Sequence, residues 1–354
     1  MLDSMGFNSR FREQADPDRL MAGEIARVVA VHRESYIISN GQAEVPAEVT
    51  GKLMFSAESP LDFPAVGDWV AVQYFNNAAS AIIDTVLPRK TILKRKTSGK
   101  KIDYQLIAAN IDTGLIVQAL DGNYNIRRLE RYLVMIHDSR IEPAVLLSKS
   151  DLLSEAEIEE RVAGIHALMP GIPVAAFSNK TGTGLDTVQV FLESQRTFCM
   201  LGSSGVGKTT LLNNLLGKEQ FATRTIRDKD GKGRHTTTGR QLIRLPGGAL
   251  LIDTPGMREL GNIAVEAGIE ETFSEISALA DQCRFADCSH TQEQGCAILA
   301  ALASGDIATE RYESYMKLAR ESAFHGMSFL EKRQKDREFG KMVRTVMKHK
   351  KNKR

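Results

Sequence analysis

The segment at residues 202–209, Gly-Ser-Ser-Gly-Val-Gly-Lys-Thr, constrains the fold of this chain more than any other feature. It follows the apolar run at 197–201 and opens the helix-prone run at 209–217, which is the strand, loop and helix context that this phosphate-binding pattern requires. The glycines let backbone amides curl around phosphate oxygens at a helix N-terminus. The segment therefore predicts a nucleotide site in an α/β domain.

Residues of this loop and of a second, downstream turn have separate expected roles. The ammonium of Lys208 reaches the β- and γ-phosphate oxygens, and the hydroxyl of Thr209 binds magnesium. The turn Asp-Thr-Pro-Gly at 253–256 closes another apolar run and supplies a carboxylate for the magnesium site and an amide for the γ-phosphate. The expected phosphate-side contacts are Gly202, Ser203, Ser204, Gly205, Val206, Gly207, Lys208, Thr209, Thr210, Asp253 and Gly256.

Two segments upstream of the phosphate loop are candidates for recognising the base. The sequence Ser-Lys-Ser-Asp at 148–151 follows an apolar run and resembles the Asn/Thr-Lys-x-Asp motif, in which the carboxylate accepts two hydrogen bonds from guanine and the lysine stem covers the ring. Ser-Asn-Lys at 178–180 is similar to the loop whose backbone amide meets the guanine carbonyl. The candidate base-side residues are Ser148, Lys149, Ser150, Asp151, Ser178, Asn179 and Lys180.

The base motif has two readings when it is considered alone. Residues 148–151 are also compatible with an ordinary turn that caps a following helix, but four motifs at strand ends in one domain favour the nucleotide reading. Ser148 replaces the usual Asn or Thr; it keeps a hydroxyl but loses reach, and one lost hydrogen bond is worth roughly 0.5–1.5 kcal/mol. We therefore expect guanine specificity with reduced affinity.

The motifs occur in an unusual order along the chain. The base motifs precede the phosphate loop, and the Asp-Thr-Pro-Gly turn comes last, whereas ordinary small GTPases begin with the phosphate loop. A sheet can survive such a permutation, because domain termini often lie close together and can be rejoined. The expected core is therefore a circularly permuted GTPase domain.

The catalytic group cannot be the glutamine that often follows Asp-x-x-Gly, because that position holds Met257. The segment Gly-Lys-Gly-Arg-His-Thr-Thr-Thr-Gly-Arg at 231–240 lies where the first switch is expected. His235 can orient water, and Thr237 is the threonine that we expect to face the metal. His235 is also compatible with a solvated loop position or an RNA contact.

Three of the four cysteines lie together near a histidine. The spacing Cys283-x4-Cys288-x-His290-x5-Cys296 places four metal ligands within 14 residues, which matches a closed tetrahedral zinc site with a structural role. The binding energy of such a site, on the order of 10 kcal/mol, would be folding energy for the local loop. The fourth cysteine, Cys199, has the surroundings of a core residue.

The chain is long enough for several domains, since 354 residues exceed one ordinary core. Five short β-rich runs between residues 25 and 93, without a convincing helix, predict a small barrel of the OB-fold type. Apolar runs then alternate with helical stretches, which is typical of a mainly parallel sheet. The expected domains are an extension at 1–24, an OB-fold RNA-binding domain at 25–100, the permuted GTPase domain at 101–264 and a zinc-binding helical domain with a basic tail at 265–354.

Charge and hydropathy indicate partners and location. The net charge is only +2, but residues 89–101 hold seven basic side chains and no acid, and the last 24 residues hold eleven against three acids. Such stretches can lie along a polyanion or be merely solvated. The sequence has no run long enough to span a membrane and its first twenty residues lack the apolar core of a secretory signal, so we expect a cytoplasmic protein. We also expect a monomer.

Taken together, these motifs resemble the ribosome small-subunit-dependent GTPase A family across nearly the whole chain. The resemblance rests on SKSD, SNKTG, GSSGVGKTT, GRHTTTG, DTPG and CRFADCSH, in that order. It implies an OB-fold, a permuted GTPase domain, a zinc-binding helical domain and a role in late maturation of the small ribosomal subunit, with hydrolysis of GTP to GDP stimulated by that subunit. It also favours His235 as the catalytic histidine.

Two other functions remain open from the residues alone. One is an RNA-binding scaffold in which the nucleotide only stabilises the fold, and the other is a phosphate-loop ATPase or kinase. Asp151 argues against the second, because adenine presents no pair of donors to a carboxylate.

Overall fold

A computed structural model describes residues 1–32, 35–96, 104–219, 221, 240–253, 265–327, 331, 334 and 337. The chain divides into two compact units: Met1–Lys94 with Gln105–Leu260, and Arg95–Tyr104 with Gly261–Arg354. Within the described ranges, every helix is too short or too polar to cross a membrane.

The first unit contains a closed barrel of five strands within residues 25–86. Residues 33 and 34 of this range are not described. The strands pair in the order β1-β2-β3-β5-β4, and β4 closes the ring by pairing with β1. All pairs are antiparallel except β3 with β5, so the predicted OB-fold barrel is confirmed. The strands are β1 (Ile25–Val31), β2 (Tyr36–Ser39), β3 (Glu44–Val49), β4 (Trp69–Phe75) and β5 (Ser80–Val86).

Helical turns lie between β3 and β4, a region in which the sequence predicts no helix. Thr50 accepts the Leu53 amide and so begins α3 (Gly51–Ser56), and the 3-10 turn η2 (Pro60–Asp62) follows. A helix of six residues shows fewer than two turns of apolar periodicity, so its pattern is too short to detect in the sequence.

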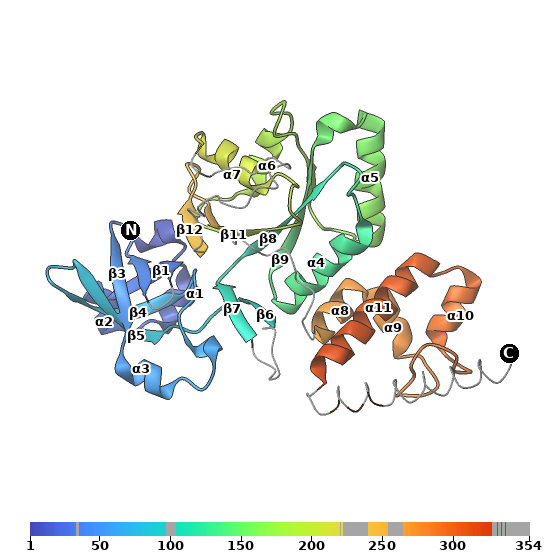
Figure 1. Cartoon of the computed structure of the whole chain (residues 1–354), viewed down its shortest axis with the longest axis horizontal. Helices are drawn as coiled ribbons and strands as arrows, with labels where there is room; N and C mark the ends of the chain where they lie inside the picture. Colours follow the sequence, from blue (N-terminus) through green and yellow to red (C-terminus); the bar gives the residue numbers. More distant parts are fainter. Residues whose placement is uncertain are drawn as a thin grey trace. The chain divides into compact units, whose positions relative to one another are not determined.

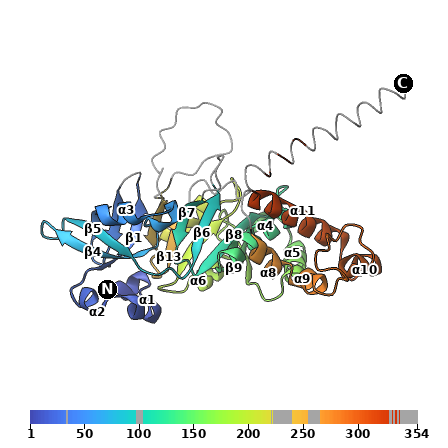
Figure 2. The ribbon, with the colours of Figure 1, turned by 90° about the horizontal axis from the view of Figure 1, so that it is seen from below.

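The N-terminal extension packs on the barrel (Figure 2). It forms η1 (Leu2–Met5), α1 (Ser9–Gln14) and α2 (Pro17–Met21). The rings of Phe7 and Phe11 are buried, with centroids 4.7 and 6.0 Å from that of Trp69. Trp69 is fully buried, so this tryptophan belongs to the core.

The α/β part of the first unit is built on a mainly parallel sheet, as the alternating pattern predicts. Its strand order is β10-β9-β8-β11-β13-β12, with only β12 antiparallel to its neighbour in this part. The strands are β8 (Thr113–Ala119), β9 (Glu142–Ser148), β10 (Val174–Ala176), β11 (Thr197–Leu201), β12 (Arg240–Arg244) and β13 (Leu250–Asp253).

Helices cover both faces of this sheet (Figure 1). One pair, α4 and α5, lies on one face, and α6 and α7 lie on the other, where Leu211 and Leu212 join a core with Leu115 and Phe198. Asn125 begins α4 by accepting the Arg128 amide. A capping box at Ser154 begins α5. The helices are α4 (Ile126–Asp138), α5 (Glu155–Leu168), α6 (Leu185–Phe191) and α7 (Lys208–Leu216), with a 3-10 turn η3 (Ser150–Leu152).

The barrel and the mainly parallel sheet share one hydrogen-bonded ladder. Strand β12 pairs with β1 through Gln241 opposite Ala30 and Arg240 opposite Val31. The sheet is therefore continuous from β10 to the barrel. A separate two-stranded sheet joins β6 (Ile92–Lys96) to β7 (Tyr104–Ala109).

Helices are the regular elements of the second unit over residues 265–327, as the sequence predicts, and residues 281–296 form turns and bends between two of them. Arg311 is buried there: its guanidinium lies 4.1 Å from the Phe273 ring and donates to Glu275 and to the Thr272 carbonyl. The basic tail beyond residue 327 falls almost entirely outside the described residues. The helices are α8 (Glu266–Thr272), α9 (Ser274–Ala280), α10 (Ala297–Ser304) and α11 (Thr309–Gly326).

Candidate nucleotide site and metal cluster

The phosphate loop connects β11 to α7, the position that the sequence predicts. Gly202, Gly205 and Gly207 have φ angles of 146°, 80° and 92°, which favour glycine over residues with a Cβ. A Cβ at Gly202 would also collide with the Val117 carbonyl. The Lys208 ammonium donates to the carbonyls of Gly202 and Ser203 at 2.6 and 2.8 Å. The loop thus brings backbone amides and one ammonium group together at a helix N-terminus.

The base motif lies at the carboxyl end of β9, and the second base loop follows β10. The Ser178 hydroxyl donates to the Asp151 carboxylate at 2.6 Å. The same Ser178 oxygen accepts the amides of Lys180 and Thr181 at 3.1 and 3.2 Å. These bonds fix the orientation of the carboxylate from a loop that is 27 residues away in the chain.

Two side chains tie the base loops to the phosphate loop. The buried Ser148 hydroxyl donates to the Val206 carbonyl at 2.7 Å. The side-chain nitrogen of Asn179 donates to the Gly207 carbonyl at 3.0 Å, and its side-chain oxygen accepts from the Asn214 side chain at 3.0 Å. The expected loss of reach at Ser148 therefore does not occur toward the phosphate loop, because the serine backbone at the end of β9 lies close to it.

Parallel strands explain why these motifs meet. Strands β10, β9, β8, β11 and β13 run in the same direction, so the loops that follow them lie at one edge of the sheet. Asp253 ends β13, whose residue Ile252 pairs with Cys199 of β11. The Asp253 backbone is thus beside the phosphate-loop strand. Its side chain is not described, and Gly256, His235 and Thr237 lie outside the described residues.

Two further side chains contact the site, and neither belongs to a motif that the sequence predicts. Asp121, after β8, pairs with the Lys149 ammonium at 2.7 Å, and Arg128 of α4 donates to the Ser203 hydroxyl at 3.2 Å. A polar residue directly after an apolar strand in the same domain was a usable pattern for Asp121. Arg128 offered no comparable pattern.

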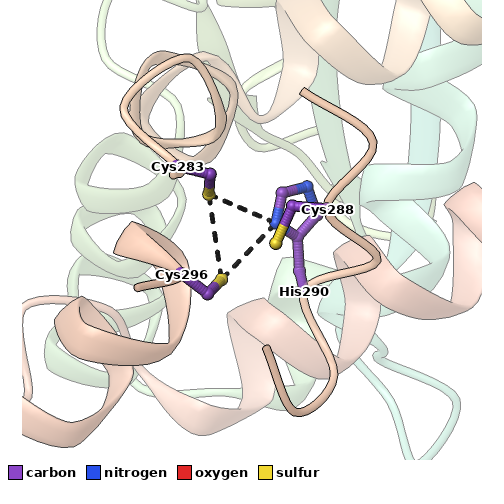
Figure 3. A group of neighbouring side chains, drawn as sticks. All are labelled: Cys283, Cys288, His290 and Cys296. Carbon is purple, nitrogen blue, oxygen red and sulfur yellow. Dashed lines mark hydrogen bonds between the residues drawn. The ribbon is translucent and has the colours of Figure 1, made fainter. Parts of the chain in front are cut away.

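The four predicted metal ligands form one cluster in the second unit (Figure 3). Their ligand atoms all lie within 4.8 Å of one another. The His290 Nδ1 is 3.6 Å from the Cys283 sulfur and 3.5 Å from the Cys296 sulfur, and these two sulfurs are 3.8 Å apart. Sulfurs bound tetrahedrally at about 2.3 Å are about 3.8 Å apart, so the cluster formed with Cys288 has the dimensions of a metal site.

Neighbouring groups shape this metal cluster. The Leu299 amide donates to Cys296, which begins α10, and the Tyr312 hydroxyl donates to the His290 carbonyl at 2.7 Å. Partial burial lowers the pKa of His290 and so favours the neutral imidazole that metals bind. Partial burial and the neighbouring thiols raise the pKa of Cys288 to about 11. A bound cation would supply the charge that holds these thiols deprotonated.

The sheet order, the phosphate loop at its carboxyl edge and the base motif on strands that precede it in the chain define a circularly permuted GTPase. The family model for the RsgA GTPase matches residues 86–263. The chain belongs to the RsgA GTPase family and is a GTP-hydrolysing enzyme.

Named relatives are similar over most of the chain. "Small ribosomal subunit biogenesis GTPase RsgA 2" of Lactiplantibacillus plantarum is 44% identical over 315 residues, covering 89% of this chain and 88% of the relative. A protein of the same name from Vibrio parahaemolyticus is 38% identical, covering 98% and 92%.

Solved structures show the same fold. The crystal structure of YjeQ from Thermotoga maritima matches with a TM-score of 0.62 and 26% identity over 85% of this chain and 98% of that one. YloQ, described as a circularly permuted GTPase, matches with a TM-score of 0.60 over 84% and 94%, at 20% identity.

Proposed function

We propose that this enzyme hydrolyses GTP to GDP and phosphate while bound to the small ribosomal subunit, assists late maturation of that subunit, and is stimulated by it. The observation that carries the proposal is the hydrogen-bonded junction of the base and phosphate loops through Ser148 and Val206. It builds a site for one nucleotide from both loops, and the similar proteins are named for biogenesis of the small subunit.

Guanine recognition falls to Asp151, which accepts from the ring N–H and the exocyclic amine, while the Lys149 stem covers the ring. The Ser178–Asp151 bond supports this assignment, because a carboxylate held in one orientation can accept both bonds without reordering. The loop at 178–180 supplies backbone amides to the guanine carbonyl. Loss of a hydrogen bond to a charged group costs about 1.5–3 kcal/mol, so ATP should bind far more weakly than GTP.

The phosphates bind along residues 202–210, with Lys208 on the β- and γ-oxygens. Thr209 and Asp253 would hold magnesium, which neutralises charge on the phosphate oxygens, and Gly256 would donate its amide to the γ-phosphate. We assign the orientation of the attacking water to His235 and a metal-facing role to Thr237. Slow intrinsic hydrolysis is expected, because the ribosomal partner completes the site.

The metal cluster would hold one structural zinc ion through Cys283, Cys288, His290 and Cys296. Three thiolates and one imidazole fill the four positions of a tetrahedral site, so zinc here would fold the loop between α9 and α10 and leave no position for a substrate.

The OB-fold barrel, the basic stretch at 89–101 and the basic tail from residue 331 would bind ribosomal RNA. Such binding is largely through phosphates and weakens steeply with salt. The proposed domains are residues 1–24, 25–100, 101–264 and 265–354. The protein would act as a monomer in the cytoplasm.

The first experiment measures GTP hydrolysis by the purified protein with and without small ribosomal subunits. Strong stimulation that His235→Ala abolishes, with subunit binding retained, is the expected result. Stimulation that survives His235→Ala would move catalysis to another group, and absence of stimulation would mean that the partner is wrong. Turnover undetectable with subunits present would favour a scaffold in which nucleotide only stabilises the fold.

A second experiment tests base recognition separately. Asp151→Asn exchanges a double acceptor for a side chain that also donates, so it should weaken GTP binding about 10- to 100-fold and improve binding of xanthosine triphosphate, whose ring carries a carbonyl in place of the amine. Preferential binding of ATP over GTP by the unaltered enzyme would instead favour a phosphate-loop ATPase or kinase.

A further inference from the structure

Asp121 lies at the carboxyl ends of the parallel strands, between the base motif and the phosphate loop. It follows β8, which pairs with β9 on one side and with the phosphate-loop strand β11 on the other. The last paired residues of β8 and β9 are Ala119 and Ser148, and the Leu120 amide donates to the Ser148 carbonyl at 2.8 Å. The backbone thus brings Asp121 next to Lys149, the residue that follows Ser148.

The side chains of Asp121 and Lys149 form a partly buried ion pair. The ammonium nitrogen lies 2.7 Å from one carboxylate oxygen, and the two side chains are 22% and 30% exposed for Asp121 and Lys149 respectively. The other carboxylate oxygen accepts the Asn123 amide at 2.9 Å. Partial burial raises the pKa of Asp121, but these bonds outweigh it and hold the pKa below its usual value. The carboxylate is therefore charged at neutral pH and fixed in orientation.

A lysine that is to cover a ring needs such a partner. Its four-carbon stem carries about 2 kcal/mol of rotamer entropy, which would be lost when the nucleotide binds. Lys149 also has a left-handed backbone, with φ of 61°, so the main chain is already set in one uncommon conformation. A fixed carboxylate at the end of the stem orders the side chain before the nucleotide arrives, which reduces the cost of binding.

We propose that Asp121 is a positioning residue of the nucleotide site, which holds the Lys149 ammonium so that the lysine stem stays extended where guanine binds. The proposal rests on the proposed role of Lys149. It gives a support to each of the two side chains that are expected to contact guanine: Ser178 holds Asp151, and Asp121 holds Lys149.

The test is a double-mutant cycle on nucleotide affinity with the full-length enzyme. Asp121→Asn keeps an oxygen for the Asn123 amide and removes the charge, and Lys149→Met keeps most of the stem and removes the ammonium. We expect Asp121→Asn to weaken the binding of GDP and GTP about 2- to 5-fold, in keeping with a partly exposed ion pair, and to raise KM while kcat at saturating GTP stays unchanged. In the Lys149→Met background, Asp121→Asn should have no further effect.

The matched control is Asp112→Asn, which breaks the Lys90–Asp112 ion pair of 2.8 Å before the start of β8. It should leave nucleotide affinity unchanged, whatever it does to the melting temperature. An equal loss of affinity from Asp121→Asn with and without the Lys149 charge would overturn the inference, because Asp121 would then act on the loop itself. Lys149→Met with normal affinity would overturn the proposed role of Lys149, whereas a loss confined to Lys149→Met would overturn the role of Asp121 alone.

Discussion

Replacing Arg27 with methionine should strongly destabilise the first unit. This arginine of β1 is 1% exposed and donates to the carbonyls of Gly67 and Asn110 at 3.1 and 3.3 Å, to the Thr197 hydroxyl at 2.9 Å, and to the Met5 carbonyl. Its partners belong to the N-terminal extension, the barrel, and the GTPase sheet with the segment that leads into it. Burial lowers the pKa of Arg27 to about 10, so it remains charged at neutral pH.

The expected loss follows from the bonds that methionine cannot make. Of the four acceptors, the Gly67 carbonyl keeps a bond from the Asn110 side chain, so the loss falls mainly on the other three. Each buried group left unpaired costs about 1–3 kcal/mol, which gives several kcal/mol, and the desolvation cost of the buried charge is recovered in part. We expect a net loss of about 3 kcal/mol. With a denaturant slope of about 3 kcal/mol per molar urea, the midpoint should fall by about 1 M.

The assay is urea unfolding followed by tryptophan fluorescence. Trp69 is the single tryptophan of the chain, and its ring lies 5.4 Å from the Arg27 guanidinium, so the signal reports this junction. The control is Arg19→Met, which removes an ion pair to Asp84 with partners 28% and 18% exposed and should cost less than about 1 kcal/mol. A loss from Arg27→Met that is no larger than this control would refute the reasoning, because the buried bonds would then be balanced by the desolvation of the charge.

Three further results are expected. Ser148→Ala removes the hydrogen bond from the Ser148 hydroxyl to the buried Val206 carbonyl. It should weaken GTP binding by about 1 kcal/mol, or about fivefold, in a titration. Unchanged affinity would mean that the loop junction holds without this bond. Burial raises the pKa of Cys199 to about 12, so its thiol stays protonated at pH 8. With a chelator present, a thiol reagent should modify only the cysteines of the metal cluster until urea exposes Cys199. Rapid reaction of all four thiols in the native enzyme would contradict the buried position of Cys199. Phe7→Ala should cost about 3–5 kcal/mol in the Trp69 fluorescence assay, and a neutral result would show that the extension is not part of the barrel core.

The sequence predicts the elements of this fold better than the junctions between them. Apolar runs and turn residues locate the five barrel strands and the parallel sheet, because strand patterns are local. The role of the extension was not predictable, since Phe7 and Phe11 are too few to form a pattern and their partner Trp69 is more than fifty residues away. Arg27 was missed for the same reason: its partners lie in four separate segments.

In the candidate site too, local motifs are predictable from the sequence and contacts between distant residues are not. Spacing alone identifies the phosphate loop and the metal cluster, because all of their residues lie within 8 and 14 positions of the chain. Contacts between loops are a different matter. The pair of Ser178 with Asp151 and that of Lys149 with Asp121 depend on which strands are neighbours in the sheet, which a single sequence does not state. The bond from Ser148 to Val206 likewise depends on how closely β9 approaches the phosphate loop.

Because of the permuted order, the contacts at the carboxyl edge of the sheet both shape the nucleotide site and join two segments of the chain. In the chain, the base motifs belong to the segment before β11, and the phosphate loop belongs to the segment after it. The bonds from Ser148 to Val206 and from Asn179 to Gly207 join these two segments. A nucleotide that spans both loops is stabilised by the same junction that holds the segments together, so its binding and the folding of the GTPase sheet are linked. The spatial order of the strands, which permutation leaves intact, is therefore what the nucleotide site requires.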